Sequence, residues 1–335
     1  MGQQLHEAQL LAAFRNDAAD GWAVSEREVS ALRAPRQRGR LRLPLRFVWA
    51  LPYGPAAALG GAVYGRADLV HRFDLRCPPS GRLEVLTIHD LPPMRFDDEG
   101  AMPRWAPRSA REATAVICPS EFAAEEVRTL LGVERVHVVP NGVDARRADA
   151  EPLQPAELAQ LGLAGNLVVH AGGATQRKNL AALAQAWPEV VSQQPDAFLA
   201  LCGPPHPRRT ELFASVPRAR YLGRRSAEFV ARLIRTAGAV VVPSTYEGFG
   251  LPALEAMVAG VPVVVAARGA LPEVCGDAGL LVEPTPGEIA RGILEALAGG
   301  PAIERLRDAG RRRALSYSWE RAARETASVY EGVLT

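Results

Sequence analysis

The chain has 335 residues, of which 48% are hydrophobic and 23% charged, and its formal net charge at pH 7 is +2. This length allows two domains, and the composition is that of an ordinary globular protein. So small a net charge argues against a nucleic-acid-binding protein, and no apolar run reaches the roughly 18 to 20 residues that a membrane-spanning helix needs.

The first third of the chain predicts a helix followed by strands. Residues 3–15 carry apolar side chains at helical spacing. Two apolar runs, 68–73 and 84–90, each end in polar residues and predict parallel strands. Because ligands gather at the carboxyl ends of such strands, His89 is a candidate binding residue. His71 is equally consistent with a structural role.

An arginine-rich segment lies between the first helix and these strands. No acidic residue occurs from Val29 to Ala67, where leucines, Phe47 and Trp49 are interspersed with arginines. These are Arg33, Arg36, Arg38, Arg40, Arg42, Arg46 and Arg66. Such a surface could lie on anionic lipid headgroups or meet a phosphate-bearing acceptor. The simpler alternative is a solvated arginine-rich loop.

Alternation of strands and helices resumes at residue 166 and predicts a parallel, doubly wound sheet. Residues 145–165 have no apolar period and are predicted to be a linker. After the first strand of this series, Gly172 and Gly173 precede Arg177 and Lys178 at a helix start. An arginine fork and a lysine point charge both pair with phosphate oxygens, so this turn predicts a diphosphate clamp. The alternative is a helix start with surface cations.

The most informative stretch is Pro243 to Met257, which predicts a strand end, a tight loop and a helix. Gly248 and Gly250 let the backbone approach a ligand, and the free N–H groups of the first helical turn attract phosphate. Glu247 precedes the helix and Glu255 is placed in its first turn. Carboxylates accept hydrogen bonds from sugar hydroxyls, so the loop predicts a nucleotide-sugar cradle. The alternative is an ordinary buried loop and helix cap.

In these residues the chain resembles the retaining glycosyltransferases of family 4 (glycosyl transferases group 1), whose fold is called GT-B. Their hallmark is a Glu-(seven residues)-Glu spacing followed by Gly-x-Pro-Val, matched here by Glu247, Glu255 and Gly260-Val261-Pro262-Val263. Thr87-Ile88-His89-Asp90-Leu91 and Arg177-Lys178-Asn179 match two further family segments. The resemblance covers roughly residues 60–330.

The resemblance implies an α/β protein of GT-B fold, with two Rossmann-like, doubly wound parallel-sheet domains facing a cleft. Residues 1–145 would form the N-terminal acceptor-side domain and residues 146–316 the C-terminal nucleotide-sugar-binding domain. Residues 317–335 would form a helix crossing back to the N-terminal domain. Family members open with a strand and a glycine-rich loop, whereas this chain opens with the helix. The N-terminal domain is therefore expected to lack its first strand, either because Met1 lies downstream of the true start or because the strand has been lost.

The resemblance also implies the activity and the residues that perform it. The reaction would be retaining transfer of a sugar from a nucleotide-sugar donor, with GDP-mannose as the best guess, to a glycan, lipid-linked or small-molecule acceptor. His89, Glu247, Lys178 and Arg177 would be catalytic, with Arg177 and Lys178 on the diphosphate and His89 on the donor sugar. The donor-binding residues would be Gly172, Gly173, Arg177, Lys178, Gly223, Glu247, Gly248, Phe249, Gly250, Leu251 and Glu255. Some members carry a further arginine six residues before the lysine, where this chain has Gly172.

No metal or other cofactor is expected, because fixed cations would replace a metal and the nucleotide sugar is a substrate. The expected partners are the donor, an acceptor and an anionic membrane in peripheral contact, with no nucleic acid. The four cysteines lack the spacing of a zinc site or a disulfide framework, which favours the cytoplasm or the inner face of its membrane. Alternatives are a non-catalytic sugar-nucleotide-binding GT-B protein, a transferase using UDP-glucose or UDP-N-acetylglucosamine, and a sugar-nucleotide epimerase.

Overall fold

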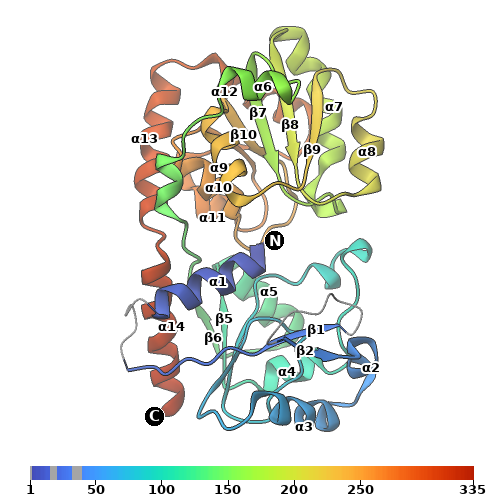
Figure 1. Cartoon of the computed structure of the whole chain (residues 1–335), viewed down its shortest axis with the longest axis vertical. Helices are drawn as coiled ribbons and strands as arrows, with labels where there is room; N and C mark the ends of the chain where they lie inside the picture. Colours follow the sequence, from blue (N-terminus) through green and yellow to red (C-terminus); the bar gives the residue numbers. More distant parts are fainter. Residues whose placement is uncertain (1, 16–20, 32–39) are drawn as a thin grey trace. The chain divides into compact units, whose positions relative to one another are not determined.

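The computed structural model describes residues 2–15, 21–31 and 40–335. The chain divides into two compact units (Figure 1). The first comprises residues 1–142 and 319–335, and the second comprises residues 143–318. Three of the seven arginines noted above, Arg33, Arg36 and Arg38, lie outside the described residues.

The first unit contains a four-stranded parallel sheet in the order β3-β4-β5-β6 and a separate two-stranded parallel sheet, β1-β2. Its elements are α1 (Gly2–Arg15), β1 (Glu28–Ala31), β2 (Arg40–Leu43), α2 (Leu45–Ala50), α3 (Tyr53–Tyr64), β3 (Val70–Arg72), β4 (Glu84–Thr87), η1 (Pro92–Met94), η2 (Asp97–Glu99), α4 (Ala106–Glu112), β5 (Ala115–Cys118), α5 (Glu121–Leu131), β6 (Val136–Val138) and α14 (Trp319–Leu334). In the described part of the chain α1 precedes every strand, as the sequence predicted.

Helices cover both faces of the four-stranded sheet, which explains why β4 and β5 are apolar at consecutive positions. Successive side chains of a strand point to opposite faces. Val85 of β4 packs with α1 and α14 on one face, whereas Leu86 packs with α4 and α5 on the other. α5 begins at an N-cap, Ser120, whose side chain accepts a hydrogen bond from the Ala123 N–H at 3.1 Å.

The helix α3 is held close to the segment at residues 78–80 by small residues. A Cβ atom at Gly60 would lie 2.0 Å from the Pro79 carbonyl oxygen, and Ala56 on the same face is fully buried. The Tyr64 hydroxyl donates to the Pro78 carbonyl at 2.7 Å. These contacts fix which face of α3 points inward and therefore which face points to solvent.

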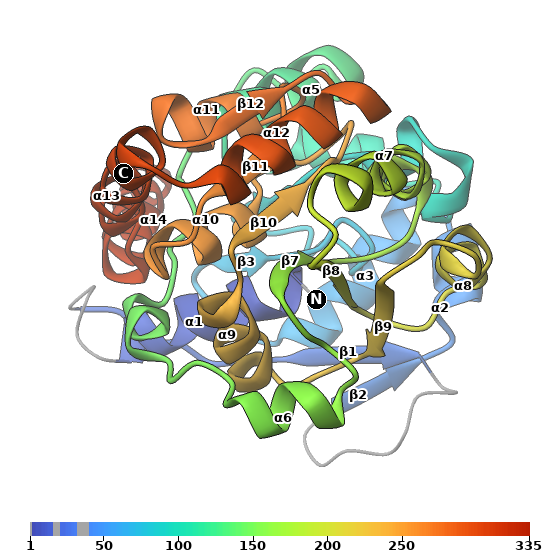
Figure 2. The same ribbon diagram turned by 90° about the horizontal axis from the view of Figure 1, so that it is seen from above.

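The second unit is built on a six-stranded parallel sheet in the order β12-β11-β10-β7-β8-β9. Its elements are η3 (Ala145–Asp149), α6 (Pro155–Gln160), β7 (Asn166–Ala171), η4 (Gln176–Lys178), α7 (Leu180–Gln193), β8 (Ala197–Cys202), α8 (Pro207–Phe213), β9 (Ala219–Gly223), α9 (Ala227–Thr236), β10 (Ala239–Val242), α10 (Leu251–Val258), β11 (Val263–Ala266), α11 (Leu271–Cys275), η5 (Gly276–Ala278), β12 (Leu280–Val282), α12 (Pro286–Ala298) and α13 (Pro301–Leu315). Figure 2 shows α7 and α12 on one face of this sheet and α9 and α10 on the other.

The strand order reverses between β7 and β10. From β7 the chain proceeds to β8 and β9 on one side, and it then returns to form β10, β11 and β12 on the other. In a doubly wound sheet, the carboxyl ends of the two strands at such a reversal are where ligands bind. The fold therefore brings the loops after β7 and β10 together.

The prediction of a linker at residues 145–165 is wrong. This segment forms η3 and α6 and packs on the second unit, with Leu153 and Leu163 buried. Glu157 of α6 accepts two hydrogen bonds from Arg232, at 2.9 and 2.7 Å. Each helical piece is too short to show an apolar period, which is why the sequence pattern missed them.

No helix within the described residues is long and apolar enough to cross a membrane.

Candidate functional site

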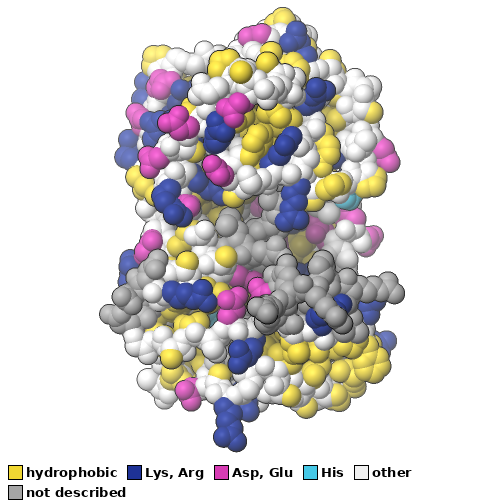
Figure 3. All heavy atoms as spheres, in the orientation of Figure 1, with side chains coloured by type: hydrophobic (Ala, Val, Ile, Leu, Met, Phe, Trp, Pro, Cys, Tyr) yellow, Lys and Arg dark blue, Asp and Glu magenta, His cyan; other side chains and the backbone are white. Residues whose placement is uncertain are grey.

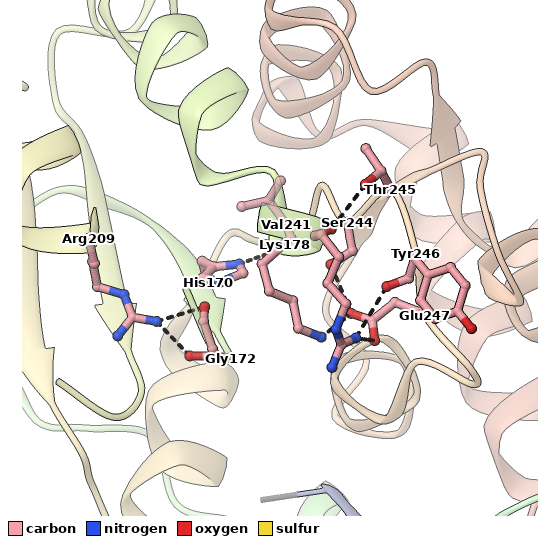
Figure 4. Close-up of polar contacts among 11 residues, drawn as sticks. His170, Gly172, Lys178, Arg209, Val241, Ser244, Thr245, Tyr246 and Glu247 are labelled. Atoms are coloured by element: carbon pink, nitrogen blue, oxygen red, sulfur yellow. Dashed lines mark hydrogen bonds and ion pairs between the residues drawn. The ribbon is translucent and has the colours of Figure 1, made fainter. Parts of the chain in front are cut away.

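The two predicted phosphate-binding segments meet at the carboxyl ends of neighbouring strands. β7 and β10 are paired in the sheet, and each is followed by one of these segments. The Thr245 N–H donates to the Arg177 carbonyl at 2.8 Å, and the Asn179 side-chain amide donates to the Pro243 carbonyl at 3.1 Å. Figure 4 shows Lys178 of the first segment directed toward Glu247 of the second, and Arg177 donates to the same carboxylate.

Glu247 is the carboxylate that joins these two segments. It accepts from Lys178 Nζ at 2.6 Å, from Arg177 Nη1 at 3.3 Å and from the Ser244 hydroxyl at 2.8 Å. Burial alone would raise the pKa of Glu247, but the charges of Lys178 and Arg177 and the hydrogen bonds from Lys178 and Ser244 lower it below its ordinary value. The carboxylate is therefore ionised, and the three groups together carry a net charge of +1 beside a helix N-terminus.

Lys178 is the single lysine of the sequence, because every other cationic side chain of the 39 is arginine. A lysine ammonium is a compact charge with three donors, of which one can bond Glu247 while others reach a ligand oxygen. The next residue, Asn179, has a left-handed backbone with φ of 51° and turns the chain from η4 into α7. Asparagine tolerates this conformation better than most residues.

Two glycines allow the loop before α10 to fold tightly. Gly250 has φ of 107°, and a Cβ atom there would lie 2.7 Å from the Leu271 side chain. Gly269 has φ of 61°, and its Cβ would lie 2.8 Å from the backbone of Glu247. The Ala270 N–H donates to the Glu247 carbonyl at 3.0 Å. The chain from Glu247 to Gly250 thus packs closely against the segment from Gly269 to Leu271 before it enters α10.

The second carboxylate of the predicted pair, Glu255, is the fifth residue of α10. It therefore lies in the second helical turn and not, as predicted, in the first. Its Oε1 pairs with Arg147 at 3.0 Å, and both side chains are largely buried. Burial raises the pKa of Glu255, with Arg147 opposing the rise. Sequence reasoning missed Arg147, because the residues of η3 were interpreted as part of a linker.

Arg209 supports the turn after β7 and was also missed by sequence reasoning. Its guanidinium is fully buried and donates to the carbonyls of Gly172 and Gly173 at 2.6 and 2.8 Å. A third bond reaches the Pro204 carbonyl at 2.7 Å, and the group lies over the Tyr221 ring. Because its donors point at carbonyls, Arg209 positions the turn. An arginine thus reaches Gly172 from α8, although none occupies that sequence position.

His170 lies directly below this turn, near the end of β7. Its Nδ1–H donates to the Val241 carbonyl at 3.1 Å, and burial lowers its pKa to about 4, so the ring is neutral. Nε2 lies 3.4 Å from the Cβ that Gly172 lacks and has no partner among the described residues. A polar residue next to last in an apolar strand was the signal in the sequence.

Gly223, with φ of 79°, ends β9, and its carbonyl accepts from the Gly203 N–H at 3.1 Å.

The first unit holds the remaining predicted catalytic residue, His89, directly beyond β4. Its ring meets that of His6 edge to face at 4.5 Å, and its Nε2 is buried without a partner in the described part of the chain. Burial and the nearby His71 lower the pKa of His89 to about 4. His71 itself is satisfied by the Tyr330 hydroxyl at 2.5 Å and the Thr87 hydroxyl at 2.7 Å, which assigns it a structural role.

Glu7 of α1 is a further titratable group that the sequence analysis did not single out. Burial raises its pKa to about 7, and the neighbouring charges of Asp74 and Glu26 add to the rise. A carboxyl with a pKa near 7 is present in both its protonated and its ionised form at neutral pH. Among the described residues, no three histidine, cysteine or acidic side chains are placed to hold a metal ion.

Comparison with known proteins matches both units to family models. The model described as "Glycosyl transferases group 1" matches residues 165–299, and the model described as "Glycosyltransferase Family 4" matches residues 2–147. The chain is 31% identical over 302 residues to the MMP alpha-(1->4)-mannosyltransferase of Mycolicibacterium hassiacum, covering 80% of this chain and 71% of the relative.

Two further similarities support the same grouping. The chain is 31% identical over 307 residues to O-antigen chain mannosyltransferase B of Escherichia coli, covering 87% of this chain and 78% of the relative. Among solved structures, sucrose-phosphate synthase from Thermosynechococcus elongatus superposes with a TM-score of 0.78 at 23% identity, covering 99% of this chain and 93% of that one. At that identity the likeness is one of fold.

The buried histidines predict a pH-dependent stability of the first unit. Burial lowers the pKa of His6 well below its ordinary value of 6.5, that of His71 to about 3 and that of His89 to about 4. Below pH 6.5 the unfolded chain takes up protons that the folded chain refuses. The histidine contribution to the free energy of unfolding should therefore fall with falling pH, by up to about 1.4 kcal/mol per pH unit for each histidine, while the raised pKa of Glu7 acts in the opposite direction.

Chemical denaturation between pH 7 and pH 5 measures this slope. His71→Gln should flatten it by about one histidine's share. Equal slopes for the wild type and His71→Gln would contradict the assignment of a buried, neutral His71.

Proposed function

The chain belongs to family 4, the group 1 glycosyltransferases of GT-B fold, and is a hexosyltransferase; on this premise we propose that it transfers mannose from GDP-mannose to a glycan, lipid-linked or small-molecule acceptor, with retention of anomeric configuration. The observation that carries the proposal is the bridge from Glu247 to both Lys178 and Arg177 at the strand reversal of the second unit. It fixes two cations beside the N-terminus of α10, where a diphosphate can be held.

The donor bond breaks between the anomeric carbon and a phosphate oxygen, so negative charge grows on the diphosphate. We assign Arg177, Lys178 and the N–H groups from Gly248 to Leu251 to this charge. Preorganised donors of this kind stabilise a transition state because they need no reorganisation as the charge develops. Gly172 and Gly173, held by Arg209, let the backbone after β7 approach the same oxygens. Phe249 is buried against Tyr317 and positions the loop.

The two carboxylates are assigned to the hydroxyls of the donor. Glu247 is ionised, and its acceptor oxygens suit the donor sugar beside the reacting carbon. Glu255, oriented by Arg147, suits the ribose hydroxyls. The backbone at Gly223 is assigned to the nucleobase, which its place at the end of β9 supports. In the first unit, the neutral ring of His89 has an unpartnered Nε2 that suits a sugar hydroxyl.

The choice of mannose is supported by the names of two relatives that are each 31% identical to the chain, both mannosyltransferases. No metal is included in the proposal, because two fixed cations are available for the diphosphate. We place the protein in the cytoplasm, which the four free cysteines support. A lipid-linked acceptor would bring the enzyme to the inner face of a membrane.

Removal of the key charges should slow the reaction without unfolding the chain. Lys178→Met and Glu255→Gln should each raise the activation free energy of donor turnover by about 2 to 4 kcal/mol, which lowers kcat/KM roughly 30- to 1000-fold. Arg291→Met and Glu288→Gln, in an exposed ion pair of α12, provide matched controls that should retain wild-type rates. Wild-type turnover in Lys178→Met or Glu255→Gln, measured with folded protein, would contradict the assignment.

A thermal-shift panel identifies the donor. A ligand at 100 times its Kd stabilises the folded chain by about 2.7 kcal/mol, so GDP-mannose should raise the Tm more than sugars of UDP, ADP or dTDP. A larger shift with UDP-glucose or UDP-N-acetylglucosamine would contradict GDP-mannose and leave the cradle assignment standing. No shift with any nucleotide sugar would contradict the cradle itself.

A further inference from the structure

An exposed apolar surface covers the outer side of α2 and α3 in the first unit; we call it the α2–α3 face. Figure 3 shows hydrophobic side chains gathered there. Phe47 is 68% exposed, and the outward positions of α3 include Pro55, Ala58 and Ala62. A surface helix normally presents polar side chains to solvent, whereas α3 has no charged residue over its whole length.

The exposure of Phe47 follows from fixed contacts of the two residues after it, Val48 and Trp49. The next residue, Val48, is buried, and its carbonyl accepts a hydrogen bond from the Trp105 indole at 3.2 Å. The Trp49 indole donates to the Arg76 carbonyl at 3.2 Å. With these two neighbours anchored, Phe47 has to point outward. Gly60 and Ala56 hold α3 in the same way with its apolar outer side toward solvent.

Within the α2–α3 segment the charged side chains have one sign, whereas the next acidic residue along the chain, Asp68, is exposed just beyond Arg66, and Arg108 of α4 is paired with Glu112. Arg46 and Arg66 are exposed at the two ends of the α2–α3 segment, and no acidic residue occurs between Val29 and Ala67. From α4, the exposed Arg108 places its guanidinium 4.6 Å from the centre of the Tyr53 ring. An apolar centre with a cationic rim suits a surface that offers hydrocarbon beneath negative charge.

We propose that the α2–α3 face docks the enzyme on an anionic lipid bilayer, with Phe47 inserted among the acyl chains and the arginines on the lipid phosphates. This inference rests on the first unit alone and requires neither the proposed donor nor the proposed acceptor. Of the three proposed kinds of acceptor, a lipid-linked one fits this inference best, because an enzyme held at the bilayer meets such a substrate at its headgroup.

A second copy of this chain is a poorer occupant of the same face. A two-fold interface places the same surface on both subunits, so arginines would face arginines. The carboxylate of α4, Glu112, is already paired with Arg108 at 3.4 Å. Lipid phosphates supply the missing negative charge, whereas a second copy does not.

Co-sedimentation of the full chain with vesicles tests the proposal. The protein should bind vesicles of equal parts phosphatidylcholine and phosphatidylglycerol more tightly than pure phosphatidylcholine, and added salt should weaken the binding. Phe47→Glu should lower the partition coefficient by on the order of tenfold or more, because it removes apolar contact and adds a repelled charge. The double variant Arg46→Gln, Arg66→Gln should lose most of the preference for phosphatidylglycerol.

Leu315→Glu is the matched control. Leu315 is 63% exposed in the second unit, so the variant makes the same change of charge at a comparable exposure. It should bind vesicles like the wild type, and Phe47→Glu should keep the wild-type thermal shift with its donor. The proposal is overturned if the wild type does not bind anionic vesicles, or if Phe47→Glu binds as well as the wild type. Equal losses in Phe47→Glu and Leu315→Glu would also overturn it, as would a dimer, seen by light scattering without vesicles, that Phe47→Glu dissociates.

Discussion

The site of the second unit depends on one interaction, the pairing of the ionised Glu247 carboxylate with Lys178 and Arg177. A buried carboxylate is costly unless cations compensate it, and here Lys178 and Arg177 supply that compensation from the neighbouring loop. The same contacts hold both cations at one edge of the sheet, where their own repulsion would otherwise separate them. Folding thus prepares a positive site with a fixed acceptor at its centre, before any ligand arrives.

The parts of this site that sequence could predict are those whose chemistry is local. The glycines, the cation pair and the two glutamates lie in short strand-loop-helix segments, and each segment carries its own turn and helix-start signals. Their meeting follows from strand order, since β7 and β10 are neighbours at the reversal of the sheet. Even there the helix phase was misjudged: Glu255 lies one turn further along α10 and is paired with a cation.

The residues that sequence could not predict act across long separations in the chain. Arg209 reaches the carbonyls of Gly172 and Gly173 from a short helix whose own sequence looks like a surface segment. Arg147 lies in a stretch too short to show a period. In the first unit, the arginine run was visible in the sequence, but only the packing of Val48 and Gly60 determines which apolar side chains remain exposed beside it.

The presence of one lysine in the sequence allows the central claim to be tested at a single atom. The rate at which an amine-reactive ester acylates Lys178 can be followed by mass spectrometry, with the terminal amine of the same molecules as the internal reference. If Lys178 contacts the diphosphate, GDP-mannose and GDP should slow its acylation strongly, while mannose alone should not. An unchanged rate at a GDP-mannose concentration that saturates the protein would contradict the account.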